Sequence, residues 1–398
     1  MHALRGRHIA LGVTGSIAAY KAADLASKLT QAGARVDVLM TEAATRFITP
    51  LTMRSLTGRP VFLDMFDPST ELAEEHVEIA RRADAVIVAP ASADTIARLA
   101  QGRADDVVGL TVLATRAPVL IAPAMDNQMY EDAVTQANLE TLRGREFDIV
   151  GPAEGRLASG RVGLGRLVEP DVLLGALRQA LGRRGDLAGR HIVITAGGTR
   201  EPMDPVRFLT NYSSGKMGYA LAEAARDRGA EVTLISTIST LSTPYGVGLV
   251  SVETVDQMRE AVLAACKGAQ ALIMAAAVSD YRPVERASQK VKKGPQTVSL
   301  ELERTPDILL EVKGRLVKVG FAAETNDLVA NAQTKLREKR LDLIVANDVS
   351  APGSGFAVDT NEVTLIDSSA EEQLPLLPKY DVAHRVLDRV VTLLRERE

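Results

Sequence analysis

The sequence lacks the features that mark secreted, membrane and nucleic-acid-binding proteins. Only one of its 398 residues is a cysteine, Cys266, which excludes an internal disulfide framework and fits a reducing cytoplasm. No apolar stretch reaches the roughly 18 to 20 residues that cross a bilayer. The 47 basic and 51 acidic residues nearly cancel, and no basic block suggests nucleic acid. We therefore expect a cytoplasmic protein whose partners are small molecules.

The chain is longer than one hydrophobic core normally organises, and parts of it resemble each other. The segment Gly6–Ile9 is matched by Gly189–Ile192, 183 residues later, and Ala83–Asp94 aligns with Ala269–Asp280, 186 residues later. Both halves read as strand, turn and helix in alternation, which favours an α/β fold of two doubly wound, mostly parallel-sheet domains. The expected boundaries are a first domain at 1–182, a linker at 183–187 and a second domain at 188–398.

The stretch from 189 to 236 is the most informative part of the second half. A buried strand at Ile192–Thr195 breaks at Gly197 and Gly198, and a helix begins near Lys216. This unit carries 13 more residues between strand and helix than its counterpart in the first half, and inserted turns of that size are usually functional. The first amides of a helix bind anions, so we expect a phosphate at Ser213, Gly215 and Lys216.

In the first half, a strand at His8–Val13 leads through Thr14-Gly15-Ser16 into a helix, and a second strand at Arg35–Met40 ends at Thr41. A domain that binds NAD would need G-x-G-x-x-G and an acidic residue at the tip of the second strand. Neither is present, because the first turn has only Gly12 and Gly15. A mononucleotide therefore fits this turn better than a dinucleotide.

Two further strands of the first half, at Ala85–Ala89 and Val119–Ala122, are followed by polar turns. These turns lie at the same carboxyl edge of the predicted sheet, where open α/β sheets bind ligands. After a strand at Asp148–Val150, residues 151–166 contain five glycines and therefore have large backbone freedom. This segment is either a mobile flap over a site or an ordinary surface loop, and its start at a strand end favours the flap.

In the second half, the turns that follow strands again carry polar and basic residues. The segment 290–295, Lys-Val-Lys-Lys-Gly-Pro, is either a lid over a nucleotide or a solvated loop. A Walker P-loop is excluded, because Thr210 and Met217 stand where that motif needs glycine and a hydroxyl residue. Several lysines and acidic residues at one edge suit a nucleoside triphosphate with a divalent cation.

These motifs together resemble the family of bifunctional coenzyme A biosynthesis proteins. The resemblance covers nearly the whole chain, with GVTGSIAAYK, APASADTIARLA and APAMDNQM in the first half and TAGGTREPMDPVRF, TNYSSGKMG, AAAVSDYRP, KVKK, GFAAET and LIVANDV in the second. It implies that the first half is a flavodoxin-like or Rossmann-like flavoprotein, a phosphopantothenoylcysteine decarboxylase. It implies that the second half is a Rossmann-like phosphopantothenate-cysteine ligase.

For the second half, the resemblance implies that CTP and Mg²⁺ convert 4'-phosphopantothenate into an acyl cytidylate, which the amine of L-cysteine then captures. Asn211 would assist that step, Lys290 would be both catalytic and a CTP ligand, and Asp280 is the candidate metal ligand. The residues implied to hold CTP are Ala275, Ala276, Ala277, Asp280, Lys290, Pro306, Asp307, Ile308, Leu309, Phe321, Lys335 and Lys339.

For the first half, the resemblance implies that FMN oxidises the thiol of the substrate, so that CO₂ leaves easily, and then returns the electrons. The residues implied to hold FMN are Gly15, Ser16, Thr41, Ser92 and Met125. His76 matches the active-site histidine of the family, although a lone histidine on a helix more often lies on the solvent-exposed surface.

Two residues depart from the pattern of the family. Asp126 stands where the family usually has asparagine, and Ser159 stands where a cysteine usually protonates the enethiolate. A thiol with a pKa near 8.5 donates a proton at neutral pH far better than an alcohol does. Either another acid, Asp126 in its protonated form or a bound water, replaces the cysteine, or the final reduction is slow. We expect decarboxylation to survive, with Asp126 and Ser159 among the catalytic residues.

Two other functions stay open at this point: a flavin-binding regulatory protein with little turnover, and an NAD-dependent oxidoreductase, which the missing fingerprint weakens. The resemblance also implies a homo-oligomer, a dodecamer built from trimers of the flavin half and dimers of the ligase half.

Overall fold

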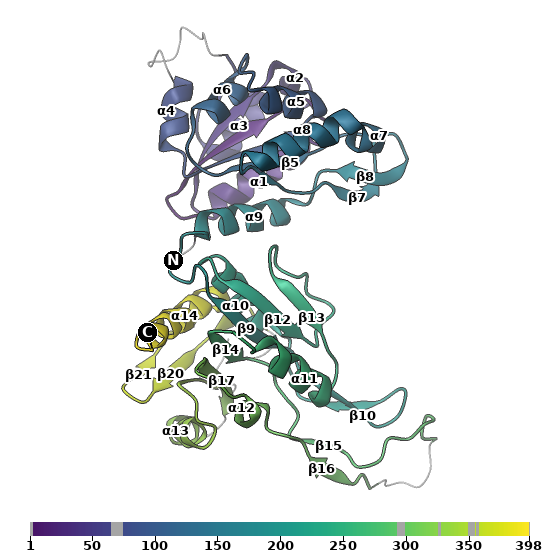
Figure 1. The fold of residues 1–398 in the computed structure, drawn as a ribbon, viewed down its shortest axis with the longest axis vertical. Coiled ribbons are helices and arrows are strands. Elements are labelled where there is room, and N and C mark those ends of the chain that lie inside the picture. Colours follow the sequence, from purple (N-terminus) through teal and green to yellow (C-terminus); the bar gives the residue numbers. More distant parts are fainter. Residues whose placement is uncertain are drawn as a thin grey trace. The chain divides into compact units, whose positions relative to one another are not determined.

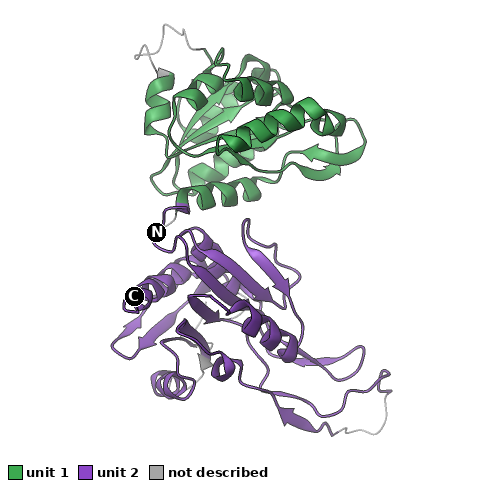
Figure 2. Cartoon of the chain, viewed as in Figure 1, with its two compact units in different colours: residues 1–181 green, residues 182–398 purple. Residues whose placement is uncertain are grey.

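The computed structural model describes residues 3–64, 75–292, 299–324, 328–348, 355 and 358–397. The chain forms two compact units, residues 1–181 and 182–398 (Figure 2). The sequence also predicts a helix at 71–82, of which residues 71–74 lie outside the described residues. Residues 293–295 of the segment Lys-Val-Lys-Lys-Gly-Pro and Thr325, the last residue of the motif GFAAET, lie outside them as well.

The first unit is built on a parallel sheet with the strand order β3-β2-β1-β4-β5-β6 (Figure 1). Its strands are β1 (His8–Val13), β2 (Arg35–Met40), β3 (Val61–Phe62), β4 (Ala85–Ala91), β5 (Val119–Pro123) and β6 (Asp148–Ile149). The strand order reverses between β1 and β4, and ligands of such folds bind outside the carboxyl ends of the strands at that point. The predicted doubly wound α/β fold is confirmed here.

Helices cover both faces of this sheet, which explains why β4 is buried along its whole length. They are α1 (Ala19–Gln31), α2 (Glu42–Thr45), α3 (Pro50–Thr57), α4 (Glu75–Arg82), α5 (Ala93–Gln101), α6 (Val107–Ala114), α7 (Asn127–Glu131), α8 (Ala133–Gly144) and α9 (Pro170–Gly182). Helices α4, α5, α6 and α8 pack over one core, while α1 packs with α3 on the opposite face.

The glycine-rich segment forms an antiparallel hairpin of β7 (Ala153–Arg156) and β8 (Val162–Arg166). Close packing explains two of its glycines. A Cβ at Gly165, whose φ is +151°, would lie 2.2 Å from the Met125 carbonyl oxygen, and one at Gly163 would lie 3.0 Å from Asn127 Cβ. These glycines therefore let the hairpin lie directly on the turn after β5.

The second unit repeats the strand order of the first and adds two antiparallel strands at one edge, giving β13-β12-β9-β14-β17-β18-β20-β21. Its strands are β9 (His191–Ala196), β12 (Glu231–Ser236), β13 (Gly248–Ser251), β14 (Ala271–Met274), β17 (Val317–Glu324), β18 (Leu343–Asp348), β20 (Val363–Asp367) and β21 (Glu371–Gln373). The point where the order reverses lies between β9 and β14. This shared topology agrees with the internal resemblance in the sequence.

Alternate residues of these strands face two separate cores. Ile192 and Ile194 pack under α10 (Lys216–Arg226) and α14 (Lys379–Arg395), whereas Val193 packs under α11 (Val255–Ala265) and α12 (Ile308–Glu311). Helix α13 (Leu328–Glu338) covers β18 and β20. Among the described residues, no helix combines the length and apolar character needed to span a bilayer.

The 13 inserted residues form a ribbon that extends from the sheet. It consists of β10 (Arg200–Pro202) and β11 (Phe208–Thr210), and β10 lies beside the second ribbon, β15 (Tyr281–Pro283) with β16 (Leu302–Arg304) (Figure 1). A third short ladder joins β19 (Thr360–Asn361) to β22 (Leu377–Pro378). The sequence predicted a functional insertion here, and the structure adds that the insertion is a paired hairpin.

Candidate active sites

The second unit has a cavity of about 680 Å³ between the start of α10, the helix after β9, and the carboxyl ends of β14, β17 and β18. It lies where the strand order reverses, as expected for an open α/β sheet. The structure brings together here most of the residues predicted for the ligase half: Asn211, Ser213, Gly215, Lys216, Ala275, Ala276, Ala277, Asp280, Pro306, Asp307, Ile308, Leu309, Phe321, Lys335 and Lys339. The side chains of Ile308 and Leu309 are buried in a core, so these two residues can offer a ligand mainly their backbone.

The first turn of α10 opens onto this cavity without a side-chain cap. Gly215 is the N-cap residue, with a φ of +74° that favours glycine. Among the described helices with an assigned N-cap residue, the side chain of that residue accepts from a first-turn amide in α2, α3, α5, α6, α7, α8, α11 and α12, but not in α1, α10 and α14. In α10 the Lys216 amide donates instead to Ser214 Oγ at 3.5 Å. The sequence predicted a phosphate at the start of α10 and a mononucleotide at the turn before α1.

Hydrogen bonds between two turns fix the floor of the cavity. The Ala277 amide donates to the Gly197 carbonyl at 2.8 Å, and the Ser279 amide donates to Thr199 Oγ1 at 3.0 Å. Asn211 Nδ2 donates to the Val278 carbonyl at 3.2 Å. The predicted Asn211 is therefore held against the turn that carries the predicted alanines and Asp280.

The lysines of the cavity differ in their partners. Lys339 Nζ lies 3.1 Å from Asp307 Oδ2, and Lys216 Nζ lies 2.7 Å from Asp359 Oδ1. A third lysine, Lys379, also lines the cavity and is only 6 % exposed. Burial, and then the charge of Lys216, lower the pKa of Lys379 from its ordinary value. Sequence reasoning missed Lys379, because it lies in no glycine-rich turn and no strand end.

Lys290 is the exception among the predicted ligase residues, because it is exposed and does not line this cavity. Its neighbour Val291 is held by the inserted ribbon: the Val291 amide donates to Asp204 Oδ2 at 3.1 Å, and Arg207 Nη2 donates to the Val291 carbonyl at 3.0 Å. Hydrogen bonds from Arg207 hold the pKa of Asp204 well below its usual range. Within the described residues, the segment 290–292 is thus part of the ribbon region.

A metal site made of protein side chains alone is absent from the described part of the chain, where no three His, Cys, Asp or Glu side chains gather closely enough. Asp280, the predicted metal ligand, is exposed at the cavity.

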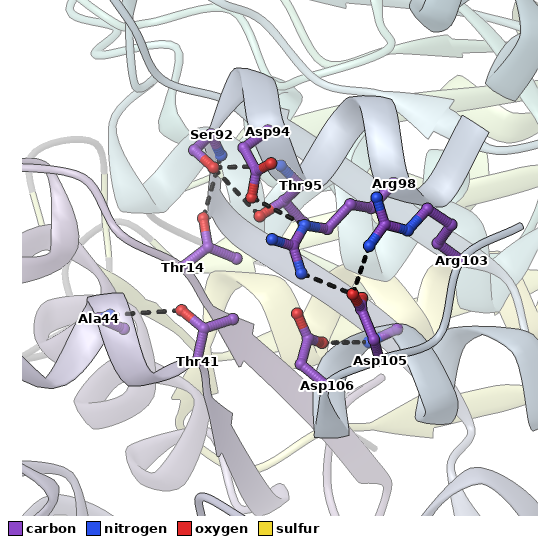
Figure 3. Close-up of polar contacts among 11 residues, drawn as sticks. Thr14, Thr41, Ala44, Ser92, Asp94, Thr95, Arg98, Arg103, Asp105 and Asp106 are labelled. Atoms are coloured by element: carbon purple, nitrogen blue, oxygen red, sulfur yellow. Dashed lines mark hydrogen bonds and ion pairs between the residues drawn. The ribbon is translucent and has the colours of Figure 1, made fainter. Parts of the chain in front are cut away.

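In the first unit, the predicted FMN ligands Thr41 and Ser92 begin helices at the carboxyl edge (Figure 3). Thr41 Oγ1 accepts from the Ala44 amide at 3.3 Å, and Ser92 Oγ accepts from the Thr95 amide at 3.2 Å. Thr14, which sequence reasoning did not select, ties the end of β1 to the end of β4: its hydroxyl donates to the Pro90 carbonyl at 2.7 Å and accepts from the Ser92 amide at 3.0 Å.

The turn after β1 holds the predicted Gly15 and Ser16, which are both half-buried. A Cβ at Gly15 would lie 2.6 Å from Ala43 Cβ, so glycine lets this turn approach α2 closely. Ser16 Oγ accepts from the Ala18 amide at 3.3 Å, just before α1. At the carboxyl ends of β1 and β2, the shape of the sheet edge therefore depends on the close packing of the turn at Gly15 against α2.

The remaining predicted residues lie where the β7–β8 hairpin meets α7. The Met125 amide donates to the Gly165 carbonyl at 2.9 Å, and Ser159 Oγ donates to Asp126 Oδ2 at 2.8 Å. The hydrogen bond from Ser159, followed by one from the Gln128 amide, lowers the pKa of Asp126. Asp126 is therefore ionised at neutral pH, which argues against the expectation that its protonated form is the acid.

His76 is half-buried near the start of α4. Figure 1 shows α4 and the β7–β8 hairpin at opposite ends of the first unit. The structure therefore does not bring His76 together with Asp126 and Ser159 within one chain.

Comparisons with known proteins cover the chain from end to end. Residues 1–182 match the family described as Flavoprotein, and residues 187–394 match the DNA/pantothenate metabolism flavoprotein C-terminal domain. The coenzyme A biosynthesis bifunctional protein CoaBC of Vibrio vulnificus (strain CMCP6) is 46% identical and covers 99% of this chain and 100% of its own. CoaBC of Bacillus subtilis (strain 168) is also 46% identical, covering 99% and 98%.

Among solved structures, the C-terminal domain of a CoaBC protein is 42% identical, with a TM-score of 0.46, and covers 53% of this chain and 99% of its own. Because the full-length similarity to the curated relatives spans both halves, the chain belongs to the family of bifunctional coenzyme A biosynthesis enzymes.

Proposed function

We propose that the second unit, expected to span 188–398, joins L-cysteine to 4'-phosphopantothenate at the expense of CTP. The first, expected to span 1–182, then decarboxylates the product with the help of FMN. The observation that carries the ligase assignment is the cavity at the β9–β14 reversal, which is lined by residues from nearly every predicted motif of that half.

In the first half-reaction, a carboxylate oxygen of 4'-phosphopantothenate attacks the α-phosphorus of CTP, and pyrophosphate leaves. The attack builds negative charge on the triphosphate, which Lys335 and Lys339 can stabilise from the cavity wall. The uncapped first turn of α10, with Ser213, Gly215 and Lys216, suits the phosphate of the substrate. The amine of cysteine then attacks the acyl carbon and CMP leaves, a step that we assign Asn211 to assist.

Mg²⁺ fits this cavity only as a partner of the triphosphate. Magnesium is usually held by one or two carboxylates together with phosphate oxygens and water. Asp280 offers one such carboxylate at the cavity, in keeping with the absence of a protein-only metal cluster from the described residues. We assign Asp280 as the carboxylate that faces the metal.

Lys290 stays a proposed catalytic and CTP-binding residue, although it does not line the cavity. Its neighbour Val291 is tied on both backbone polar groups to Asp204 and Arg207 of the inserted ribbon. A lysine at this position would act on the triphosphate only after the ribbon region and the cavity approach each other, within one chain or between two.

The turns after β1, β2 and β4 fit a flavin mononucleotide. The turn at Gly15 packs so closely on α2 that a Cβ there would clash, and the first turn of α1 has no side-chain cap. The hydroxyl of Thr41 accepts from an amide, which leaves its hydrogen to donate to a ligand. The hydroxyl of Ser92 accepts from the Thr95 amide and shares a second hydrogen bond with the Thr95 hydroxyl at 3.1 Å. When bound, FMN would supply the oxidation of the thiol and the return of the electrons after CO₂ has left.

The protein groups proposed for the decarboxylation are His76, Asp126 and Ser159, with Met125 against the flavin. We propose that His76 moves the proton at the substrate, because imidazole is the side chain best suited to this near neutral pH. Ionised Asp126 holds the Ser159 hydroxyl, so the last proton reaches the product from Ser159 or from water rather than from Asp126.

We further propose that the active form is a homo-oligomer, with trimers of the first unit and dimers of the second forming a dodecamer. The separation of α4 from the β7–β8 hairpin supports the trimer, because His76 of one copy could then meet Asp126 and Ser159 of another. The ribbons of the second unit carry exposed apolar side chains, among them Phe208 and Tyr281, which suits the dimer contact.

A coupled assay tests the proposal. Full-length protein with 4'-phosphopantothenate, L-cysteine, CTP and Mg²⁺ should release pyrophosphate and CO₂ and form 4'-phosphopantetheine, identified by mass. Pyrophosphate without CO₂ would refute decarboxylase turnover and favour a flavin-binding regulatory role for the first unit. Failure of the complete mixture to release pyrophosphate would refute the ligase assignment.

A further inference from the structure

Lys216, the first residue of α10, is neutralised by a carboxylate of the same chain. Its Nζ lies 2.7 Å from Asp359 Oδ1, and the side chains of Lys216 and Asp359 are 33% and 89% exposed. Lys216 lines the cavity, whereas Asp359 is not one of the lining residues. The ammonium group that faces the predicted phosphate position is therefore already engaged.

Lys379 fixes the backbone that presents Asp359. The Lys379 amide donates to the Asp359 carbonyl at 2.9 Å, and Lys379 Nζ donates to the carbonyls of Val358 and, at 3.1 Å, Thr360. A further bond at 2.9 Å reaches the Gly355 carbonyl. One lysine thus binds three consecutive carbonyls around Asp359, beside the β19–β22 ladder.

An ammonium group has three hydrogens to donate, and Lys379 uses them on the carbonyls of Gly355, Val358 and Thr360. Lys379 therefore acts through these backbone groups on either side of Asp359 rather than as a direct ligand of a phosphate. Burying a cation costs free energy unless its N–H groups are hydrogen-bonded, which explains why all three hydrogens of the Lys379 ammonium group are used.

We propose that Asp359 is an internal counter-ion that a phosphate monoester must displace from Lys216, and that Lys379 is the positioning residue that holds Asp359 in place. A phosphate carries more negative charge than a carboxylate and can also accept from the first amides of α10, so it wins this competition. A substrate without a phosphate cannot compete in this way. Asp359 thereby lowers the affinity of this position for the phosphorylated substrate, an inference that rests on the proposed ligase function.

The first test measures binding of inorganic phosphate to the full chain, through its effect on the melting temperature. Asp359→Asn should tighten phosphate binding about two- to fivefold, the range expected when one exposed ion pair is removed. Asp171→Asn is the matched control, because Asp171 also lies 2.7 Å from a lysine, Lys28, with similar exposure, but in the first unit. Unchanged or weaker phosphate binding in Asp359→Asn would overturn the proposal.

The second test uses the ligase reaction with all substrates. In Asp359→Asn, KM should fall for 4'-phosphopantothenate more than for CTP. A fall confined to CTP would mean that Lys216 serves a phosphate of the nucleotide, and a raised requirement for Mg²⁺ would mean that Asp359 is a metal ligand; either result overturns the assignment. A wild-type protein without CTP-dependent ligation would refute the proposed function, while the phosphate-binding test would still decide the role of Asp359.

The third test addresses Lys379. Lys379→Met keeps the length of the side chain and removes its donors, so it should lower the same KM as Asp359→Asn. The double variant should show no further change, because both substitutions release the same ion pair. Additive effects would refute the positioning role. If Lys379→Met does not fold, the Asp359→Asn experiments still decide whether the counter-ion exists.

Discussion

At the scale of single residues, the two departures from the family pattern are in contact with each other. Ser159 donates to Asp126 at 2.8 Å, and this hydrogen bond is the main cause of the lowered pKa of Asp126. A carboxylate accepts from a hydroxyl more strongly than an amide oxygen does. The two residues therefore form a hydrogen-bonded pair that joins the tip of the hairpin to the start of α7.

The Ser159–Asp126 pair predicts in which direction the pH dependence of decarboxylation shifts when the hydrogen bond is removed. If ionised Asp126 is needed, activity persists as the pH falls until the lowered pKa is reached. Replacing Ser159→Ala removes the main stabilisation of the carboxylate, so the acidic limb of the rate of CO₂ release should move to higher pH. Ser55→Ala, which removes an exposed hydroxyl on α3, should leave the limb in place. An unmoved limb in Ser159→Ala would mean that this hydrogen bond does not tune the reaction.

The identity of the proton donor can be tested at the same position. Ser159→Cys introduces a thiol, whose pKa near 8.5 makes it a much better acid than an alcohol at neutral pH. If proton delivery limits the last step, 4'-phosphopantetheine should form several-fold faster, and less oxidised enethiol should accumulate when products are identified by mass. Equal product ratios in the two proteins would show that water or another group already delivers the proton efficiently.

At the scale of elements, the close approach of α10 to β9 positions the ligase cavity. A Cβ at Gly218 would lie 2.6 Å from Ala196 Cβ and 2.8 Å from the Thr195 carbonyl oxygen. Glycine at this point of a strand–turn–helix unit lets the helix pack tightly on the sheet. The first turn of α10 is thereby held at the end of β9, where the cavity begins.

Gly218→Ala should push α10 away from the sheet and cost about 1 to 3 kcal/mol of stability, as overpacking in a core does. Because the first-turn amides of α10 move with the helix, KM for 4'-phosphopantothenate should rise more than KM for CTP. Calorimetry and ligase kinetics measure the two effects. Gly144→Ala, at the exposed end of α8 where a Cβ meets nothing within 4 Å, is the control.

The sequence predicted the elements well where short-range chemistry decides them. The strands at His8–Val13 and Arg35–Met40 coincide with β1 and β2, because apolar runs bounded by glycine-rich turns are unambiguous. It could not predict that the segment at Lys290 joins the inserted ribbon, since the Asp204–Val291 contact spans 87 residues. Lys379 was out of reach for the same reason: its role depends on carbonyls 19 to 24 residues earlier, which carry no side-chain signal.

At the scale of the whole molecule, the packing of α14 on α10 makes the second unit sensitive to acid. His384 packs edge-on to Tyr380 with ring centroids 4.6 Å apart, and burial lowers its pKa to about 4. The unfolded chain binds this proton below about pH 6.5, so the stability from neutral His384 is complete above that pH and is lost as the pH falls towards 4.

His384→Phe keeps a ring beside Tyr380 and removes the titration. Between pH 6.5 and 4, the wild type should lose up to about 3 kcal/mol more than the variant, because a shift of one pKa unit corresponds to about 1.4 kcal/mol. Calorimetric melting of the unit as a function of pH measures this difference. Parallel curves for the two proteins would show that His384 is protonated as easily in the folded chain as in the unfolded one.

The separation of His76 from Asp126 predicts how whole chains must cooperate. If each decarboxylase site takes α4 from one copy and the hairpin from another, His76→Asn and Asp126→Ala each inactivate every site of a pure oligomer. Oligomers co-assembled from equal amounts of both chains would regain about a quarter of the wild-type sites, because half of the α4 helices and half of the hairpins are intact. CO₂ release by the mixed protein measures the recovery, and pyrophosphate release by the second unit provides the internal control. If the mixture stays as inactive as its parents, the site must assemble within one chain, and α4 would have to reach the hairpin by a movement of the first unit itself.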